Sequence, residues 1–326
     1  MRLSASFRGK AWSALVRYGV MIVFAFLLFG IILLIAGNDP IQSYRDLFGS
    51  TLGSAYGLSE VFVAMTPMLL TALAVALPAR IGLINVGVEG QLYLGAGLAT
   101  WGALAFGDLP AWLLLPWMIV LGMIGGSLWA LIPGILRALG LVNETITTLL
   151  LNSVAPLIVS FFVFGFWHSP MDTNKTPNFP PAARLPTLFD TRIDLSLVIA
   201  LLLLAVFWLA MKYSRWGLEM RAIGGNPQAA LRNGIPLKTY LISVMCIGGA
   251  MGGLAGMAQV SGFYGVLLAN FSRGIGYMGF LISWLAGGNP LGIVLTSFGV
   301  AIITSGGSLL QITRDVPYAV INILLA

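Results

Sequence analysis

Polar side chains that could bind a solute are concentrated in two short segments of this chain. The first is RIGLINVGVEGQLYLG at residues 80–95, which has one acid and two carboxamides among glycines. The second is LVNETITTLLLN at 141–152, which also has one acid and two carboxamides but no glycine. A further carboxamide ends an apolar run. Carboxamides, hydroxyls and carboxylates can exchange hydrogen bonds with a small polar solute. If these residues line a path along which a solute moves, the candidate residues of that translocation path are Asn85, Glu89, Gln91, Asn143, Glu144, Thr148, Asn152 and Gln259.

Enzyme chemistry has little support in the sequence. His168 is the only histidine and Cys246 the only cysteine, so a multi-histidine or cysteine-based metal site is excluded, as is an internal disulfide. A Ser-His-Asp arrangement would rest on His168 alone. The only Gly-Lys pair is followed by Ala11, so the chain lacks a nucleotide-binding phosphate loop. We expect no catalytic residue, metal site or cofactor on this chain.

The polar residues must be positioned by membrane-spanning helices, because the composition is that of an integral membrane protein. Of the 326 residues, 58% are hydrophobic and 9% are charged, and the mean hydropathy is +0.94. We predict an all-α protein whose single transmembrane domain, residues 1–326, contains about ten spans. The apolar runs are 18–36, 61–78, 92–106, 111–136, 145–167, 195–211, 239–259, 277–286, 291–304 and 316–326.

The distribution of charge predicts how these runs are oriented. The formal net charge is +6, but the charges are too sparse and separated to form a nucleic-acid-binding patch. With a cytoplasmic N-terminus and ten crossings, most of the 17 lysines and arginines fall on the cytoplasmic side, as the positive-inside rule requires. We interpret the first run as a retained helix rather than a signal peptide, and the short eighth run could be re-entrant.

Three hydrophilic stretches separate the runs. Residues 37–60 are predicted to hold a short external surface helix, and the external loop 167–194 is too rich in proline for a helix. The third stretch, 212–238, is cytoplasmic. In it, Asn226 is a good N-cap and Pro227 suits the first helical position, whereas Gly234 ends the helix. A helix of about two turns is marginal alone in water, so it either docks into a partner or folds back on this protein as a connector.

Two interpretations are open for the acids of the first two segments. Glu89 and Glu144 each begin a helix that leaves the cytoplasmic side, where the helix dipole and free N–H groups stabilise a carboxylate by about 0.3–1 kcal/mol. In the alternative, the glycines let the backbones pack closely, and Asn85 and Glu89 face a central path. Asn152 likewise either lines a path with Thr148 or forms interhelical hydrogen bonds.

Four segments carry a family resemblance. GLINVGVEGQ, NETITTLLLN, RAIGGNPQAALRNGI and AGGNPLG occur in the order and spacing of the permease subunits of bacterial ABC importers, in the branch that includes branched-chain amino acid, ribose-type and nucleoside permeases. The resemblance covers about residue 61 to the end, and INVGVEGQ is most similar to the nucleoside type. In that family the loop matching 217–235 carries the coupling helix. The resemblance thus implies an ATPase-coupling role for Gly217, Arg221, Ala222, Gly224, Asn226, Pro227, Ala229, Ala230 and Gly234.

The resemblance also implies an activity and a set of partners. The activity is import of a small polar solute across the bacterial cytoplasmic (inner) membrane by alternating access, with a nucleoside or related purine compound favoured and a simple sugar next. ATP and Mg²⁺ would act on cytoplasmic ATP-binding subunits. The further partners are an external solute-binding protein, a second permease copy or related permease, and membrane lipid, without nucleic acid.

Two rival functions belong to other classes. A self-contained secondary transporter or channel would need acidic coupling sites within broken helices at the middle of the membrane, whereas both internal glutamates lie near a predicted interface. A scaffold without transport would not stimulate ATP hydrolysis. Recovery of an ATPase with the chain distinguishes the importer from the first rival.

Overall fold

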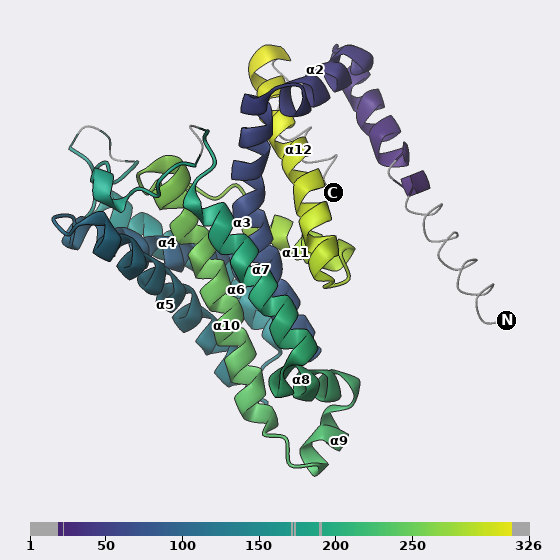
Figure 1. Cartoon of the computed structure of the whole chain (residues 1–326), viewed down its shortest axis with the longest axis vertical. Coiled ribbons are helices and arrows are strands. Elements are labelled where there is room, and N and C mark those ends of the chain that lie inside the picture. The colour runs from purple at the N-terminus through teal and green to yellow at the C-terminus, as the bar shows by residue number, and fades with distance from the viewer. Residues whose placement is uncertain (1–18, 22, 171, 173, 189–190, 315–326) are drawn as a thin grey trace, which may run out of the picture. The chain divides into compact units, whose positions relative to one another are not determined.

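The computed structural model describes residues 19–314 except 22, 171, 173, 189 and 190, and the regular elements of this part are all helical (Figure 1). The predicted all-α membrane fold is therefore confirmed. The chain divides into two compact units. We name them the terminal unit, residues 1–61 and 300–326, and the central unit, residues 62–299.

Among the described residues of the central unit, ten α-helices lie wholly or partly within it, and the unit boundaries fall inside the first and the last of them. They are α3 (Ala55–Ala79), α4 (Val88–Ala105), α5 (Ala111–Ala138), α6 (Glu144–Phe164), α7 (Leu195–Tyr213), α8 (Arg215–Gly225), α9 (Pro227–Arg232), α10 (Leu237–Ala258), α11 (Ile275–Leu285) and α12 (Pro290–Arg314). A 3₁₀-helix, η1 (Pro181–Ala183), and a π-helix, η2 (Gln259–Tyr264), complete the unit.

The core of the central unit is the packing of α4, α5 and α10. Glycines line the surfaces where these helices meet, and glycines four residues apart, such as Gly249 and Gly253, let helix backbones approach closely. A Cβ atom on Gly253 of α10 would overlap the carbonyl oxygen of Gly122, and one on Gly126 of α5 would overlap that of Gly249. Since no side chain intervenes, the backbones of α5 and α10 touch directly. Helix α4 is buried along most of its length.

Six helices of the described residues are long and apolar enough to cross a membrane, namely α3, α5, α6, α7, α10 with η2, and α12. A seventh span results if the helical residues 19–35 and the bent helix after them are counted together. Helix α4 contains Glu89 and Gln91, which lower its hydropathy, and α11 has only 11 residues. The total of about ten spans therefore stays a prediction, as does the re-entrant course of α11. The predicted run 316–326 lies outside the described residues.

Helix α12 extends ten residues beyond the predicted run 291–304. The extension contains serines, a threonine and glycines, which ended the apolar pattern. Hydroxyls at the end of the run and in the extension bond to the preceding turn of the helix: Thr304 Oγ1 donates to the carbonyl of Val300 at 3.0 Å, and Ser308 Oγ donates to that of Thr304 at 3.0 Å. Hydroxyls satisfied in this way are compatible with a continuous helix.

The loop 167–194 has no α-helix among its described residues, as predicted, but it is fastened to the segment that follows α10. The N–H of Thr176 donates to Leu267 O at 3.0 Å, and that of Phe179 donates to Gly265 O at 2.8 Å. Such backbone bonds give an ordered loop whose only regular element among the described residues is the short 3₁₀-helix η1.

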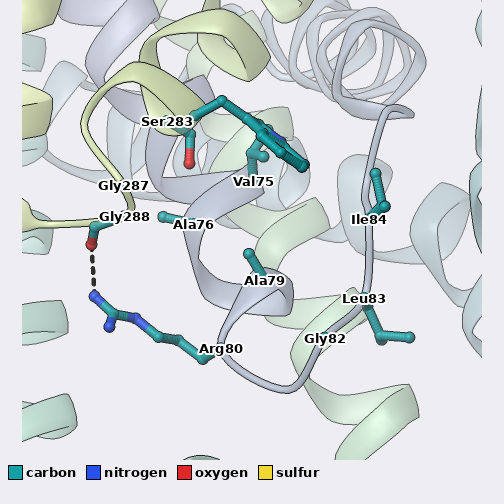
Figure 2. A pocket seen from close by; sticks show the side chains of 11 residues that line it. Val75, Ala76, Ala79, Arg80, Gly82, Leu83, Ile84, Ser283, Gly287 and Gly288 are labelled. Carbon is teal, nitrogen blue, oxygen red and sulfur yellow. Dashed lines mark hydrogen bonds between the residues drawn. The ribbon is translucent and has the colours of Figure 1, made fainter. Parts of the chain in front are cut away.

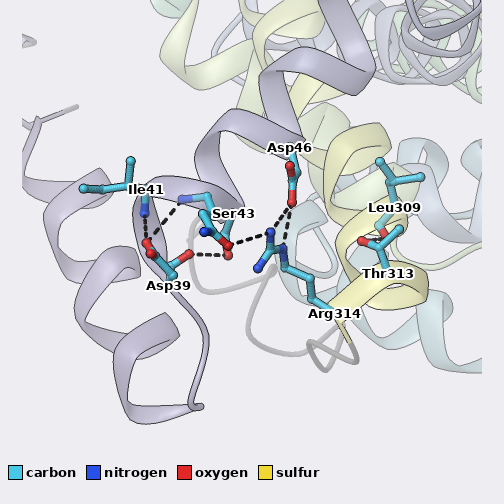
Figure 3. Close-up of polar contacts among 8 residues, drawn as sticks. Asp39, Ile41, Ser43, Asp46, Leu309, Thr313 and Arg314 are labelled. Carbon is cyan, nitrogen blue, oxygen red and sulfur yellow. Dashed lines mark hydrogen bonds and ion pairs between the residues drawn. The ribbon is translucent and has the colours of Figure 1, made fainter.

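The terminal unit contains the helix predicted within residues 37–60. It is α2 (Pro40–Leu52), and Asp39 caps it by accepting the N–H of Ile41 at 2.8 Å (Figure 3). Arg314, at the end of α12, holds α2 through Asp46: its Nε donates to Oδ2 at 2.8 Å and its Nη2 at 2.5 Å (Figure 3). Two donors that share one carboxylate oxygen fix the position of the guanidinium on α2.

Candidate functional site

The loop between α3 and α4 is organised by a pair of buried carboxamides. Asn85 Nδ2 donates to Gln91 Oε1 at 3.3 Å, and Gln91 Nε2 donates back to Asn85 Oδ1 at 3.0 Å. Asn85 also donates to the carbonyl of Ala74 in α3 at 3.2 Å and accepts the N–H of Gly87 at 3.1 Å. Both side chains are buried. The pair thus ties the loop to both of the helices that it connects.

Two residues of α6 pack against the same loop. Asn152 Oδ1 accepts the N–H of Gly90 at 2.9 Å, and its Nδ2 donates to the carbonyl of Val86 at 2.8 Å. Thr148 lies one turn away, and a Cβ atom on Gly87 would come within 2.9 Å of the Thr148 Cβ. The loop therefore needs glycine at this position to approach α6.

Glu89 lies between the first turns of two helices. Its own helix is α4, and its Oε2 accepts the N–H of Gly276 in the first turn of α11 at 2.7 Å. The Ser272 side chain and the Gly274 backbone also interact with this carboxyl group. Glu89 is 5% exposed, so these groups and the Gly276 N–H replace the water that it would bind at a surface. It interacts with the positive end of both helices.

Glu144 performs a similar task at the start of α6. Its Oε1 accepts the N–H of Ile84 at 3.3 Å, and its Oε2 forms an ion pair with Arg137 Nε at 3.1 Å. Arg137 ends α5 and is half-exposed. Asn143 is exposed and caps α6 by accepting the N–H of Thr145 at 2.8 Å. The start of α6 is thus bonded to α5 and to the α3–α4 loop.

Gln259 lies away from these residues. The side chain of Gln91 contacts Gly252 of α10, where an added Cβ would be 3.1 Å from Gln91 Cβ. Gln259 comes seven residues after Gly252, which corresponds to about 10 Å of helix. It is buried at the first position of η2. The structure therefore brings Asn85, Glu89, Gln91, Glu144, Thr148 and Asn152 together around one loop and leaves Gln259 apart.

The polar residues around this loop hold the ends of the helices in place. The carboxamides and carboxylates around this loop are bonded to groups of the protein itself, so a solute would have to replace those bonds. The hydrogen bonds of Glu89 favour the helix-start interpretation over a path-lining one. A role in the path for these residues stays a prediction.

Helices α8 and α9 form a second candidate site, which we call the elbow (residues 214–234). Ser214 caps α8 by accepting the N–H of Gly217 at 3.0 Å. A Cβ atom on Gly217 would come within 2.6 Å of the carbonyl oxygen of Met211, so only glycine lets α8 turn back against the end of α7. Arg221 Nη1 donates to that same carbonyl. Ala222, beside Arg221, is exposed.

Helix α9 matches the predicted capped helix. Asn226 Oδ1 accepts an N–H three residues later at 3.0 Å, and the chain leaves the helix at Gly234, whose φ is +80°. Ala230 is buried against this chain itself, whereas Ala229 and Leu231 are exposed. One side of α9 is therefore held by the protein, and the other is available to a partner.

The elbow is also bonded to α10. The hydroxyl of Tyr240 donates to Glu219 Oε2, and Arg215 Nε donates to Glu219 Oε1 at 2.7 Å. The hydrogen bond from Tyr240 first, and the bond and charge of Arg215 next, hold the pKa of Glu219 below its usual value of 4.5. Trp216 stacks on the Tyr240 ring with centroids 6.4 Å apart.

A cavity of about 410 Å³ opens beside the end of α3 and the end of α11 (Figure 2). Its walls are apolar apart from Arg80, Ser283 and backbone groups. Arg80 Nη2 donates to the carbonyl of Gly288 in the α11–α12 turn at 2.5 Å (Figure 2). The guanidinium carbon of Arg80 also lies 5.6 Å from the centre of the Phe207 ring.

Two residues of these sites were not among the candidates from sequence. The sequence indicated Arg80 only as one of the basic residues on the cytoplasmic side, and Gly276 lies one residue before the predicted run 277–286. A Cβ atom on Gly276 would come within 2.5 Å of the Glu89 Cα, so this glycine lets α11 approach α4. The sequence shows Arg80 as a single arginine between two apolar runs. It does not show the partner of Arg80, because the Gly288 carbonyl is 208 positions away in the sequence.

Apolar helices that pack through glycine around a buried, hydrogen-bonded polar loop define a multi-pass helical membrane protein. Residues 57–326 match the family model described as the permease component of the branched-chain amino acid transport system. The chain belongs to this family of ABC transporter permeases, whose members lie in the cytoplasmic membrane. The expected family is thus confirmed.

Individual relatives agree with this assignment. A glucose ABC transporter permease of Haloferax volcanii is 36% identical over 97% of this chain and 86% of its own length. A nucleoside ABC transporter permease of Lactococcus lactis is 32% identical over 94% of this chain and 87% of its own. A guanosine ABC transporter permease of Bacillus subtilis is also 32% identical, over 91% and 86%.

A solved structure shows the same fold. It is described as an inward-facing conformation of a metal-chelate type ABC transporter, with a TM-score of 0.50 and 14% sequence identity over 94% of this chain and 95% of that chain. At this identity the likeness concerns the fold alone.

Proposed function

We propose that this chain is the membrane-spanning subunit of an ATP-driven importer for a nucleoside or related purine compound. The observation that carries the proposal is the match of residues 57–326 to the permease family. The partners are a pair of cytoplasmic ATPase subunits, an external solute-binding protein, and a second permease that is either the same chain or a related one. ATP and Mg²⁺ are bound and used by the ATPases.

The elbow is the surface that receives the ATPase. Its exposed side offers Ala229 and Leu231, and its buried side is fixed by Ala230 and by the Asn226 cap. An isolated six-residue helix would not persist in water, but one that is capped and held on one side can present a defined surface. Docking of an apolar helix face into a groove then transfers movement of the ATPase to α8.

The transport cycle is alternating access. The polar loop between α3 and α4 fixes the cytoplasmic-side ends of α3, α4 and α6 to one another, so these ends move as a body. Movement of that body relative to α11 and to the second permease opens the path on one side and closes it on the other.

Two relatives support the choice of a nucleoside, since a nucleoside and a guanosine permease each share 32% identity with the chain. The second candidate is a simple sugar, because the glucose permease shares 36%. A purified complex in proteoliposomes, loaded with ATP, should take up radiolabelled guanosine and exclude glucose. Uptake of glucose with no uptake of guanosine or adenosine would replace the first candidate by the second.

The first test is recovery of the tagged chain from its native membrane in mild detergent, with co-purifying proteins identified by mass. We expect an ATPase, together with either no second permease or a related one, which decides between a homodimer and a mixed dimer. Recovery of the chain alone after crosslinking would favour a secondary transporter or channel.

A matched pair of variants tests the elbow within that experiment. Leu231→Glu places a charge on the exposed side of α9, where Leu231 is 58% exposed, and should abolish recovery of the ATPase. Leu139→Glu makes the same change at a residue that is 59% exposed after α5 and should leave recovery unchanged. Equal recovery with both variants would remove the elbow from the ATPase interface.

A further inference from the structure

Arg80 stands at a junction of three segments that are distant in the sequence. It follows the last residue of α3, and its Nη2 donates to the carbonyl of Gly288 at 2.5 Å in the turn between α11 and α12 (Figure 2). Gly287 and Gly288 have φ of +57° and +66°, in the left-handed region that favours glycine. The turn thereby presents its carbonyl to the guanidinium.

The elbow touches the same residue from the other side. Gly224, near the end of α8, lies so close that a Cβ atom there would overlap the carbonyl oxygen of Arg80. The backbone of α8 therefore rests directly on the Arg80 peptide. Arg221 lies one turn earlier in α8. Burial of Arg80 lowers the pKa of its guanidinium, and the positive charge of Arg221 lowers it further. A displacement of α8 moves the Arg80 backbone or separates it from the elbow.

Helix α11 is held at both ends by residues that flank the α3–α4 loop. Glu89 accepts the N–H of Gly276 in the first turn, and Arg80 bonds the turn that follows the last residue. In the middle, Gly279 packs so closely on Thr71 of α3 that a Cβ atom would overlap the Thr71 side chain. The position of α11 thus depends on the two residues, 80 and 89, that bracket the loop.

The guanidinium of Arg80 is incompletely bonded in this conformation. Its Nε is buried and has no hydrogen-bond partner among the described residues. A buried donor without a partner is costly, so a conformation that supplies one would be favoured at this atom. The contact with Gly288 is a single hydrogen bond, which can be exchanged for another as α11 moves.

We propose that Arg80 is the positioning residue that transmits movement of the elbow to α11, with Gly224 as its contact on the elbow and the Gly288 carbonyl as its contact beside α11. The inference rests on the proposed function, because it assigns the route by which ATPase movement reaches the cytoplasmic-side ends of the helices. Arg80 touches neither ATP nor solute in this role. Its loss should separate ATP hydrolysis from transport.

The test measures solute transported per ATP hydrolysed by the complete complex in proteoliposomes. Arg80→Gln removes the charge, and we expect the ratio to fall at least about fivefold, the lower range of coupling between sites, while ATPase recovery stays the same. Arg80→Lys keeps a cation that can reach the carbonyl and should restore part of the ratio. Gly224→Ala pushes on Arg80 from the elbow and should lower the ratio without touching the guanidinium.

Arg314→Gln is the matched control, because it removes an arginine that pairs with Asp46 in the terminal unit. It should leave the ratio unchanged. If Arg80→Gln and Gly224→Ala leave the ratio of solute transported to ATP hydrolysed unchanged, the inference is overturned. It is also overturned if the complex, ATP hydrolysis and uptake are lost together, because that result indicates a structural role for Arg80. A wild-type complex that lacks an ATPase would instead overturn the proposed function itself.

Discussion

Glu89 illustrates how a residue that begins one helix can fix the position of another. Its helix-start place was predictable, because acids favour the first turn. Its acceptance of the Gly276 N–H was not, because the two residues lie 187 positions apart and no local pattern links them. The same holds for Asn152, whose polar type was recognised but whose bonds to the α3–α4 loop depend on tertiary packing.

The bond geometry predicts how Glu89 responds to substitution. Glu89→Gln keeps an oxygen that can accept the Gly276 N–H, so the variant should fold and assemble. Glu89→Ala leaves that N–H buried and unpaired, at a cost of about 1–3 kcal/mol. The thermal unfolding midpoint of the purified complex in detergent should therefore fall for Ala and remain close to wild type for Gln.

Equal destabilisation by the two Glu89 variants would show that charge, rather than the hydrogen bond, stabilises the contact. Normal assembly of Glu89→Gln with abolished uptake would instead support a path-lining role.

At the scale of elements, the sequence predicted the helix caps, and it predicted close helix packing in part. Asn226 and Gly234 predicted the limits of α9 correctly, since their effect is local. The apolar pattern located the long helices of the central unit but ended the run 291–304 ten residues before the end of α12, because a hydropathy count registers hydroxyls as polar and does not register their hydrogen bonds to the preceding turn. The apolar pattern did not predict that the helix continues beyond α10 as the π-helix η2.

The α5–α10 contact predicts a sharp dependence on glycine. Gly253→Ala would place a methyl group on the Gly122 carbonyl and force the helices apart, at a cost of about 1–3 kcal/mol or more. Gly299→Ala is the matched control in α12, because nothing lies within 4 Å of an added Cβ. The detergent-solubilised Gly253→Ala protein should unfold at lower temperature, whereas Gly299→Ala should not. Equal unfolding temperatures would mean that α5 and α10 can separate freely.

The elbow should respond to pH through Glu219. Its pKa is lowered by Tyr240 and Arg215, so the stabilisation is complete above the ordinary value of 4.5 and is lost as pH falls through the lower value of the folded state. Amide-exchange protection of α8, corrected for intrinsic rates, should therefore be constant from about pH 8 to about pH 5 and decline below that range.

Glu219→Gln provides the comparison for this pH series. It removes the titrating group, so α8 should be less protected at neutral pH and insensitive to further acidification. A wild-type protein whose α8 protection declined between pH 8 and 6 would contradict the assignment to Glu219.

At the scale of the whole molecule, composition predicted the membrane environment, whereas the division into two units was not predicted. Hydropathy reports how apolar a segment is but not which segments pack together, so the burial of α4 among other helices was not predicted. By contrast, α6 and α7 expose large apolar side chains over much of their length. We expect those surfaces to face lipid or, under the proposed function, a second permease.

A charge on such a surface should impair insertion according to its depth. Leu157 is 70% exposed near the middle of α6, so Leu157→Arg should cost about 2.5–3.5 kcal/mol on insertion. Phe166, 78% exposed just after α6, is the control, because Phe166→Arg lies nearer the interface and should cost much less. The fraction of chain inserted in an in-vitro translation assay with membranes measures both. Normal insertion of Leu157→Arg would place that surface against water or a polar partner.

The π-helix η2 has a consequence for how the length of α10 can vary among related chains. Each of its backbone rings closes one residue later than in an α-helix, so the segment from Gln259 to Tyr264 contains one residue more than an α-helical continuation would need. Deleting a residue elsewhere in α10 would rotate everything after it by about 100°. Deleting one within η2 would restore ordinary pitch and keep the following chain, from Gly265 onward, in phase.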